Sequence, residues 1–423
     1  MTIVNTANNI PDSDGRYVLV LPADGRDHER ALRRVMGASD VYRTLDATDA
    51  SDAGEFLGAD AVVFDTLGLA VVHVDPDQRE SLRRASDDIL SVEPERQFHP
   101  VAARAAEYLS GYRDGVGDLA RRIDGGAEER PRWFVGPEPI GDDAISTWGL
   151  RAVGVDAIEA GGAGIKVAVL DSGFSFDHPD FADRDFYVRS FIPGEEPDDG
   201  HGHGTHCGGT ACGPRVPATG VRRYGVAHSA DLYVGKVLSS RGTGTDTSVF
   251  AGIDWAIRQG CEVISMSLGS DDPRVSVAHE RAGAAALERG SLIIAAAGNN
   301  ADRPWYPGFV GVPANSPSVM AVGAVDSALQ VASFSATSNP VPGGQVDIVG
   351  PGVGVFSSWL APRWYATLDG TSMATPAVAG LAAVYAETTG RRGRDLWAQL
   401  VQTAQRLPAS SADVGSGLAH AAA

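Results

Sequence analysis

The sequence predicts an α/β fold: a three-layer domain with a mostly parallel sheet and helices on both faces, preceded by a small α+β domain. Beyond residue 142, continuous apolar runs alternate with amphipathic stretches such as residues 248–259 and 275–288. Apolar runs without polar alternation indicate strands buried on both faces, as in a parallel sheet covered by helices. The expected strands are residues 167–170, 232–237, 263–266, 292–296, 319–325 and 346–349.

The N-terminal domain, residues 1–98, is predicted to run strand–helix–strand–strand–helix–strand, which is the ferredoxin-like order. Residues 99–141 indicate a linker, because a polar stretch with an expected helix over 101–123 is followed by glycines and prolines. The main domain is therefore expected to span residues 142–423. In the first domain the expected strands are residues 17–21, 61–64, 69–74 and 89–93, and the helices are residues 27–36 and 77–85.

Composition and charge exclude several classes of protein. The chain has 423 residues and a formal charge of −19, which disfavours nucleic acid as the main partner because phosphates repel an acidic surface. No apolar run has the length that a membrane span needs. Cys207, Cys212 and Cys261 are too few for a disulfide framework. No export signal is evident, so the sequence favours the cytoplasm, with secretion as the alternative.

Two motifs carry titratable groups that could do chemistry. Asp171 directly follows the first strand of the main domain, where a buried carboxylate is costly unless it is paired or hydrogen-bonded. His201, His203 and His206 lie in one glycine-rich segment with Cys207. Histidine and cysteine bind zinc, so a zinc site is one interpretation of this segment. The other is a histidine that acts as a general base at the start of a helix.

Two further motifs carry groups suited to developing negative charge. Ser372 lies in the sequence Gly-Thr-Ser-Met-Ala at the start of a long small-residue helix, and free N–H groups at a helix N-terminus favour anions. Taken alone, such a serine is more commonly an N-cap. Asn299 follows the strand at residues 292–296, and its amide could donate to an oxyanion.

The chain order Asp171, His203, Ser372 is the order found in subtilisin, whereas α/β-hydrolases have Ser, Asp, His. On these motifs, residues 142–423 resemble the subtilisin-like serine proteases (subtilases). Cys207, directly after His206, is similar to the proteinase K branch. The resemblance implies a serine endopeptidase with a subtilisin-like fold that acts on polypeptides and needs no cofactor for its chemistry. Two rivals are an inactive subtilase fold that serves as a binding module, and a lipase or esterase, which the motif context disfavours.

The resemblance also implies roles for individual residues. Asp171 would orient the histidine, His203 would be the general base, and Ser372 would be the nucleophile. Asn299 and the Ser372 N–H would stabilise the oxyanion, and in subtilisin loss of this Asn lowers kcat about 10²–10³-fold. The histidine segment then needs no zinc. A thiol beside the base predicts sensitivity to mercurials.

Substrate pockets follow from the same resemblance. Gly311 would form the floor of an S1 pocket for a large apolar P1 residue. Asp246 lies where the family often has an apolar residue, which predicts tolerance of a basic P4 residue. The segments expected to pair with the substrate or to wall its pockets are Gly242, Thr243 and Gly244; Ser267, Leu268 and Gly269; and Ala296, Ala297 and Gly298.

The N-terminal domain resembles a subtilase propeptide, an intramolecular inhibitor and folding chaperone. Self-cleavage is expected within residues 130–143, and a permanently attached regulatory domain is the alternative. The Pro317 and Val319 carbonyls with the Asp347 carboxylate resemble a structural calcium site. Residues 213–224, where many subtilisins bind calcium strongly, contain three arginines in this chain and disfavour a second site.

Overall fold

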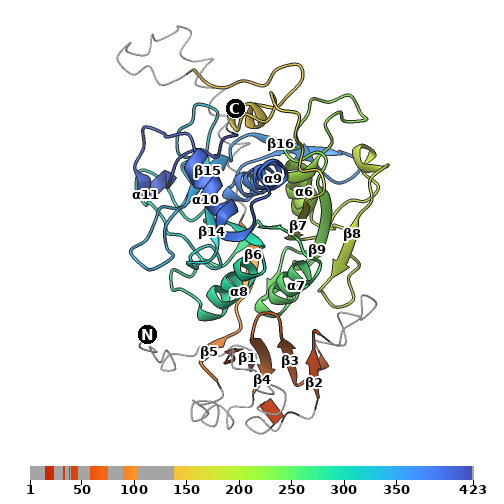
Figure 1. The fold of residues 1–423 in the computed structure, drawn as a ribbon, viewed down its shortest axis with the longest axis vertical. Helices are drawn as coiled ribbons and strands as arrows, with labels where there is room; N and C mark the ends of the chain where they lie inside the picture. The colour runs from red at the N-terminus through yellow and green to blue at the C-terminus, as the bar shows by residue number, and fades with distance from the viewer. Residues whose placement is uncertain are drawn as a thin grey trace, which may run out of the picture.

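The fold was analysed in a computed structural model, which describes residues 15–22, 32–33, 38, 40–45, 58–74, 89–101 and 138–421. It contains a large α/β domain and a smaller N-terminal sheet, drawn in red and orange below the large domain in Figure 1. The helices expected at residues 27–36, 77–85 and 101–123 fall almost entirely outside the described residues. Among the described residues, no helix has the length and apolarity that crossing a membrane requires.

The large domain is built on a seven-stranded sheet in the order β15-β14-β13-β11-β7-β9-β8. Every neighbouring pair in this sheet is parallel. The predicted three-layer α/β fold and its six strands are confirmed, while the edge strand β8 was not predicted because its residues lack an apolar run. The strands are β7 (Lys166–Asp171), β8 (Tyr187–Ser190), β9 (Asp231–Lys236), β11 (Val263–Met266), β13 (Leu292–Ala296), β14 (Met320–Val325) and β15 (Ile348–Pro351).

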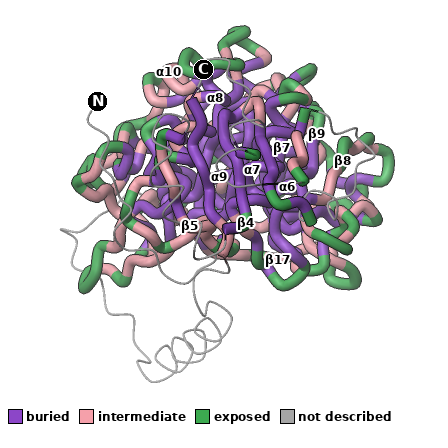
Figure 2. Tube along the Cα trace, turned by 90° about the horizontal axis from the view of Figure 1, so that it is seen from below, coloured by how far each residue is buried: buried purple, intermediate pink, exposed green. Residues whose placement is uncertain are grey.

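Helices cover both faces of this sheet, as the side chains of β7 show. Val167 and Val169 belong to one apolar core, together with residues of α6 and α9. Ala168 and Leu170 point to the other face and belong to a second core, together with residues of α7 and α8. Helix α9 lies among buried residues at the centre of the molecule (Figure 2). The four helices are α6 (His203–Cys212), α7 (Asp246–Arg258), α8 (Val277–Glu288) and α9 (Thr371–Thr389).

Shorter elements complete the large domain. An antiparallel pair, β16 and β17, follows β15 in the sequence and packs beside α6. Helix α10 follows α9 and packs against α9 and α8. These elements are α5 (Trp148–Ala152), η2 (Pro179–Phe181), β16 (Val355–Ser358), β17 (Tyr365–Leu368), α10 (Gly393–Thr403) and α11 (Ser411–Val414).

The N-terminal sheet has the strand order β2-β3-β4-β1-β5. Without β2, this is the ferredoxin-like order expected from the sequence. The extra strand β2 pairs with β3 in parallel at the edge, and its three half-buried residues gave no strand signal. The strands are β1 (Arg16–Val20), β2 (Val41–Arg43), β3 (Ala61–Phe64), β4 (Leu69–His73) and β5 (Ser91–Pro94).

The N-terminal sheet packs against α7 and α8 of the large domain (Figure 1). Val18 and Phe64 of the sheet share an apolar core with Phe250 of α7, and the Phe64 and Phe250 ring centroids are 6.1 Å apart. Glu93 accepts hydrogen bonds from the N–H groups of Val277 and Ala278 at the start of α8, at 2.7 and 3.2 Å. An acid at a helix N-terminus satisfies its free N–H groups, so β5 docks by charge as well as by apolar contact.

Beyond β5 the chain enters the large domain. Strand β6 (Gln97–Pro100) lies between β10 (Gly244–Thr245) and β12 (Leu268–Gly269) and is antiparallel to both. The domain boundary expected at residue 98 therefore falls inside a strand that is paired on both sides. This pairing directs the residue that follows β6, Val101, toward the carboxyl ends of the central strands.

Candidate active site

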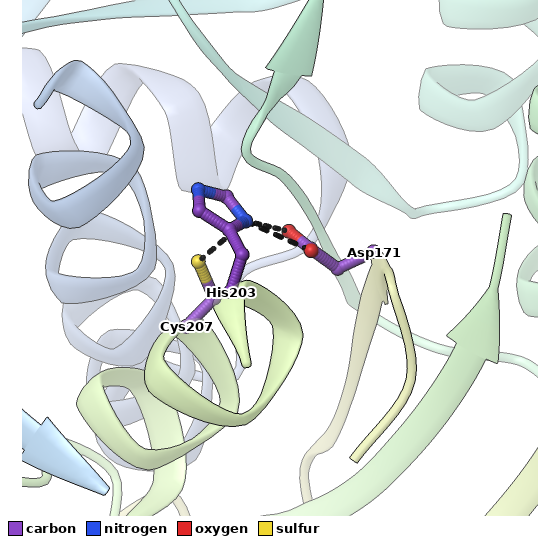
Figure 3. Close-up of side chains that lie close together, drawn as sticks. All are labelled: Asp171, His203 and Cys207. Carbon is purple, nitrogen blue, oxygen red and sulfur yellow. Dashed lines mark hydrogen bonds and ion pairs between the residues drawn. The ribbon is translucent and has the colours of Figure 1, made fainter. Parts of the chain in front are cut away.

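Asp171 is the last residue of β7, near the middle of the parallel sheet. It is 1% exposed, because the four residues before it are buried apolar side chains that fix the strand in the core. Its carboxylate accepts the N–H of Ser172 at 2.8 Å and faces Nδ1 of His203 at 2.8 and 3.0 Å (Figure 3). These contacts compensate the burial of the carboxylate.

His203 is the first residue of α6 and follows Gly202, whose φ of 99° is a conformation that glycine adopts without strain. Because a carboxylate only accepts, Nδ1 of the ring must donate, which leaves Nε2 as the basic atom. Nε2 is buried and has no hydrogen-bond partner within the part of the chain that the structure describes. Burial lowers the pKa of His203, but the charge of Asp171 together with Cys207 and the hydrogen bonds to both outweighs the burial and raises the pKa well above its usual value.

Ser372 lies in the first turn of α9 and is fully buried. Its Oγ is 2.7 Å from the Val101 carbonyl oxygen and 3.0 Å from the Ser267 carbonyl oxygen. Among the described residues, the structure joins Asp171 to His203 but shows no hydrogen bond between His203 and Ser372. The two elements are nevertheless adjacent, because the sulfur of Cys207 is 3.8 Å from Nδ1 of His203 and 3.6 Å from the Ser372 carbonyl oxygen.

Asn299 follows β13 and points its amide at the same Val101 carbonyl. Its Nδ2 donates to that oxygen at 2.6 Å. Its Oδ1 accepts the N–H and the hydroxyl of Thr371, each at 2.9 Å, which fixes the orientation of the amide. Asn299 Nδ2 and Ser372 Oγ therefore meet at one carbonyl group. The amide is placed to donate to an oxyanion that forms on this oxygen, and the hydroxyl oxygen is placed next to the carbonyl that it would attack.

The peptide at this site comes from the chain itself. The Val101 N–H donates to the Ser267 carbonyl at 3.2 Å, and Pro100 and His99 lie opposite Leu268 and Gly269. On the other side, Phe98 lies opposite Gly244. Sequence reasoning missed this occupant, because a five-residue segment carries no signal for the distant strands that it joins.

The other residues expected to bind substrate lie around this segment. Nδ1 of His99 is 3.3 Å from the Gly242 carbonyl, while the Thr243 carbonyl accepts the N–H of Ser239. The Gly311 N–H donates to the Ala297 carbonyl at 3.1 Å, so residues 296–298 and Gly311 form one wall. A Cβ on Gly311 would lie 2.6 Å from the Ser270 carbonyl oxygen, so backbone packing also requires glycine at this position.

The remaining histidines have separate environments. His206 is fully buried and faces the Val355 carbonyl at 3.0 Å, and burial lowers its pKa to about 3. The zinc interpretation therefore loses one of its three histidines. Asp171, His203 and Cys207 do place their ligand atoms within 4.8 Å of one another. Their carboxylate and imidazole are already hydrogen-bonded to each other, which favours acid–base chemistry over metal binding.

The residues expected to bind a cation lie where strands β14 and β15 begin, whereas Asp171 lies where β7 ends. The Asp347 carboxylate accepts the Ala321 N–H at 2.7 Å, and its burial raises its pKa to about 7. Pro317 and Val319 precede β14, the strand next to Asp347. Among the residues that the structure describes, no basic side chain pairs with this buried carboxylate, which is the environment that a calcium ion would complete.

The segment at residues 213–224 has a different environment. Arg223 is buried and donates to the carbonyls of Val155, Gly225 and Val226. The Asp180 carboxylate accepts the hydroxyl groups of Tyr224 and Tyr365, each at 2.8 Å. Protein donors therefore already satisfy these charged groups.

Comparison with known proteins agrees with this geometry. The sequence model of the subtilase family matches residues 162–417. M-protease of Shouchella clausii (strain KSM-K16) is 42% identical over 241 residues, which cover 56% of this chain and 58% of the relative. Subtilisin Savinase of Lederbergia lenta is 42% identical over the same share of this chain and 82% of its own length. Subtilisin E of Bacillus subtilis (strain 168) is 42% identical over 225 residues, which cover 53% of this chain and 55% of the relative.

Replacing Asp171 with asparagine should lower the pKa of His203. The charge that raises this pKa is lost, while the burial that lowers it remains. NMR titration of the imidazole in a Ser372→Ala background measures the change without turnover. Asp177→Asn is the matched control, because Asp177 accepts a hydrogen bond from Ser175 instead. An unchanged His203 pKa in Asp171→Asn would contradict the assignment of Asp171 as its partner.

Proposed function

Because the chain belongs to the subtilase family, we propose that it is a serine endopeptidase that hydrolyses peptide bonds through an acyl-enzyme. The observation that carries the proposal is the Val101 carbonyl, which receives Asn299 Nδ2 at 2.6 Å and Ser372 Oγ at 2.7 Å. A carbonyl carbon so placed is next to the nucleophile, and its oxygen is next to a fixed donor. Both are needed for acyl transfer.

The chain's own groups supply each step of the mechanism. Nε2 of His203 removes the Ser372 proton, for which the hydroxyl turns from the carbonyl oxygen toward the ring by rotation about one side-chain bond. Ser372 Oγ then bonds to the carbonyl carbon, and Asn299 stabilises the oxyanion. The protonated His203, held by Asp171, gives its proton to the leaving amine. Water, deprotonated by His203, finally releases the acyl group from Ser372.

We further propose that the enzyme cleaves itself between Val101 and Ala102. Strand β6 lies between β10 and β12, in what we call the substrate cleft, with backbone pairing on both sides as an extended substrate would have. The Val101 carbonyl is the group presented to Ser372. This places the cleavage site some thirty residues before the region 130–143 that the sequence suggested, because the pairing of β6 and not the position of the linker selects the bond.

Expression of the wild-type chain should yield a new N-terminus that begins Ala102-Ala103-Arg104, measured by N-terminal sequencing of the fragments. The Ser372→Ala chain should stay intact, because it lacks the nucleophile. A fluorophosphonate probe should label the wild-type enzyme at Ser372 and leave Ser372→Ala unlabelled.

The same experiment separates this proposal from its rivals. Cleavage within residues 130–143 would contradict the assignment of Val101. Labelling without any self-cleavage would support a permanently attached regulatory domain. Absence of both labelling and cleavage would indicate an inactive subtilase fold that acts as a binding module.

The N-terminal domain would then serve as inhibitor and folding chaperone. Its segment β6 blocks the cleft, and Glu93 and Glu95 bind the starts of α8 and α7 through Val277 and Thr247. These helix termini have free N–H groups that need partners while the domain folds. Cleavage at Val101 would leave the domain bound until it is degraded, so we expect activity to appear later than the cleavage itself.

We propose that the S1 pocket prefers large apolar residues. Val101 would occupy this pocket, and its Cγ2 lies close to the backbone of Gly269, where an added Cβ would approach to 3.1 Å. Peptides that differ only at P1 should show kcat/KM about fourfold higher for Leu than for Val, and a larger increase for Phe, because each buried methylene adds roughly 0.8 kcal/mol and about 1.4 kcal/mol is a factor of ten. A preference for Val over both would show that the pocket is closed to larger side chains, and a preference for Glu would contradict its apolar character.

We propose a structural calcium ion held by Asp347 with the carbonyls of Pro317 and Val319. Millimolar calcium should raise the melting temperature of the Ser372→Ala protein by about 5 °C relative to chelator. Asp347→Asn should abolish this rise. Asp326→Asn is the matched control, because Asp326 directly follows the neighbouring strand β14. An equal rise in Asp347→Asn would exclude this site.

The pKa of Asp347 determines how the stability of the folded state and its stabilisation by calcium depend on pH. Its folded value of about 7 lies above the ordinary value of 3.8, so the folded state binds the proton more tightly. Stability without calcium should therefore fall as the pH rises from about 4 to 7. The stabilisation by calcium should grow over the same range, because the ion binds the charged carboxylate.

A further inference from the structure

We propose that Asp246, assisted by Asp272, forms a subsite that selects a basic residue at P6 of a polypeptide substrate. The inference rests on the proposed endopeptidase function and on the placement of Val101 at P1. Counting back along the same strand puts Phe98 at P4 and Arg96 at P6. The chain's own segment thus shows how the large domain receives a basic side chain five residues before the reacting carbonyl.

Arg96 is bound through both its backbone and its side chain. Its N–H donates to Oδ2 of Asp246 at 2.7 Å, and its carbonyl accepts the Asp246 N–H at 3.2 Å. Its guanidinium is 13% exposed and lies 3.7 Å from Asp246 and 3.8 Å from Asp272. The same guanidinium donates to Oγ of Ser276 at 3.3 Å. Any residue at P6 could make the backbone pair, but only a basic one could make the side-chain contacts.

The Asp246 carboxylate of the large domain is held in position to accept a hydrogen bond from the P6 residue. It is fully buried at the start of α7, and Oδ1 faces Nε2 of His279 at 2.7 Å. One carboxylate oxygen is therefore held by the imidazole, and the other accepts the backbone N–H of the P6 residue. A guanidinium 3.7 Å from that oxygen adds a positive charge beside a buried negative one, so a basic substrate gains more than a neutral one.

This arrangement changes the expectation of a basic P4 residue. Phe98 fills the P4 position and is fully buried, and its ring centroid lies 5.3 Å from that of His279. His279 thus separates Asp246 from the P4 side chain, and the carboxylate faces the P6 residue instead. The geometry points to substrates with an aromatic residue at P4 and a basic residue at P6.

Two neighbouring charges modify the strength of this subsite. Glu93 lies 2.9 Å from the Arg96 guanidinium, but it belongs to the N-terminal domain and is absent from a separate substrate. Arg274 pairs with Asp272 at 3.0 Å and is 76% exposed, so it competes with the substrate for that carboxylate. Asp246 therefore contributes most of the selectivity, and Asp272 adds a smaller part.

The test uses the self-processed enzyme and quenched peptides of the sequence Xaa-Gln-Phe-His-Pro-Val-Ala-Ala, with Arg, Lys, Gln or Glu at Xaa. We expect kcat/KM about tenfold higher for Arg and Lys than for Gln at low salt, and lowest for Glu. The difference should lie in KM, because a remote contact binds substrate and transition state alike. Raising the salt should reduce it.

Substitutions assign the effect to the two carboxylates. Asp246→Asn should bring the Arg/Gln ratio close to one, and Asp272→Asn should reduce it by a smaller factor. Asp271→Asn is the matched control in the same loop, since Asp271 contacts Asn300 instead, and it should leave the ratio unchanged. If Asp246→Asn does not fold, the smaller effect of Asp272→Asn against Asp271→Asn still supports the subsite.

The outcomes separate this inference from the function on which it rests. An Arg/Gln ratio near one in an enzyme that cleaves all four peptides would overturn the subsite and leave the endopeptidase function standing. A ratio that persists in both Asp246→Asn and Asp272→Asn would also overturn it. Failure to cleave any peptide, together with no fluorophosphonate labelling, would overturn both proposals.

Discussion

The hydrogen bond between Asp171 and His203 is the interaction on which the site depends. It joins the end of β7 to the start of α6, two elements that meet only because β7 is buried between two helical layers. Both partners are almost fully buried, so neither has water as an alternative partner. The bond fixes the tautomer of the ring and directs its basic atom away from the carboxylate, where a nucleophile can use it.

The N-terminal domain supplies hydrogen-bond partners to backbone groups of the large domain at three places. Glu93 and Glu95 bind the first N–H groups of α8 and α7, and β6 pairs with the edges of β10 and β12. Free N–H groups at a helix start can bind the acidic side chains of an extended peptide. Free strand edges can pair with the backbone of the same peptide. The helix starts and strand edges that would bind a substrate therefore also hold the N-terminal domain.

The hydrogen-bonded pair of Asp246 and His279 links specificity to the docking of this domain. Asp246 and His279 form a buried pair, and the second carboxylate oxygen of Asp246 accepts the Arg96 N–H and lies 3.7 Å from the Arg96 guanidinium. Phe98 closes the apolar side of the same pair. Without a bound segment, the Asp246 carboxylate and the apolar side of His279 would both be exposed. The N-terminal domain and a substrate therefore compete for the same contacts.

The sequence by itself determined the parallel sheet, the order of the small domain's strands apart from β2, and the candidate groups Asp171, His203, Ser372 and Asn299. Apolar runs and short motifs are local, so they survive in the linear pattern. Only the tertiary structure decided that residues 97–101 fill the cleft and that Val101 meets Ser372. It also decided that Asp246 faces Arg96 and that His279 stands between Asp246 and Phe98. These contacts join residues up to 271 positions apart in the sequence. They depend on the packing of whole elements, which no single segment encodes.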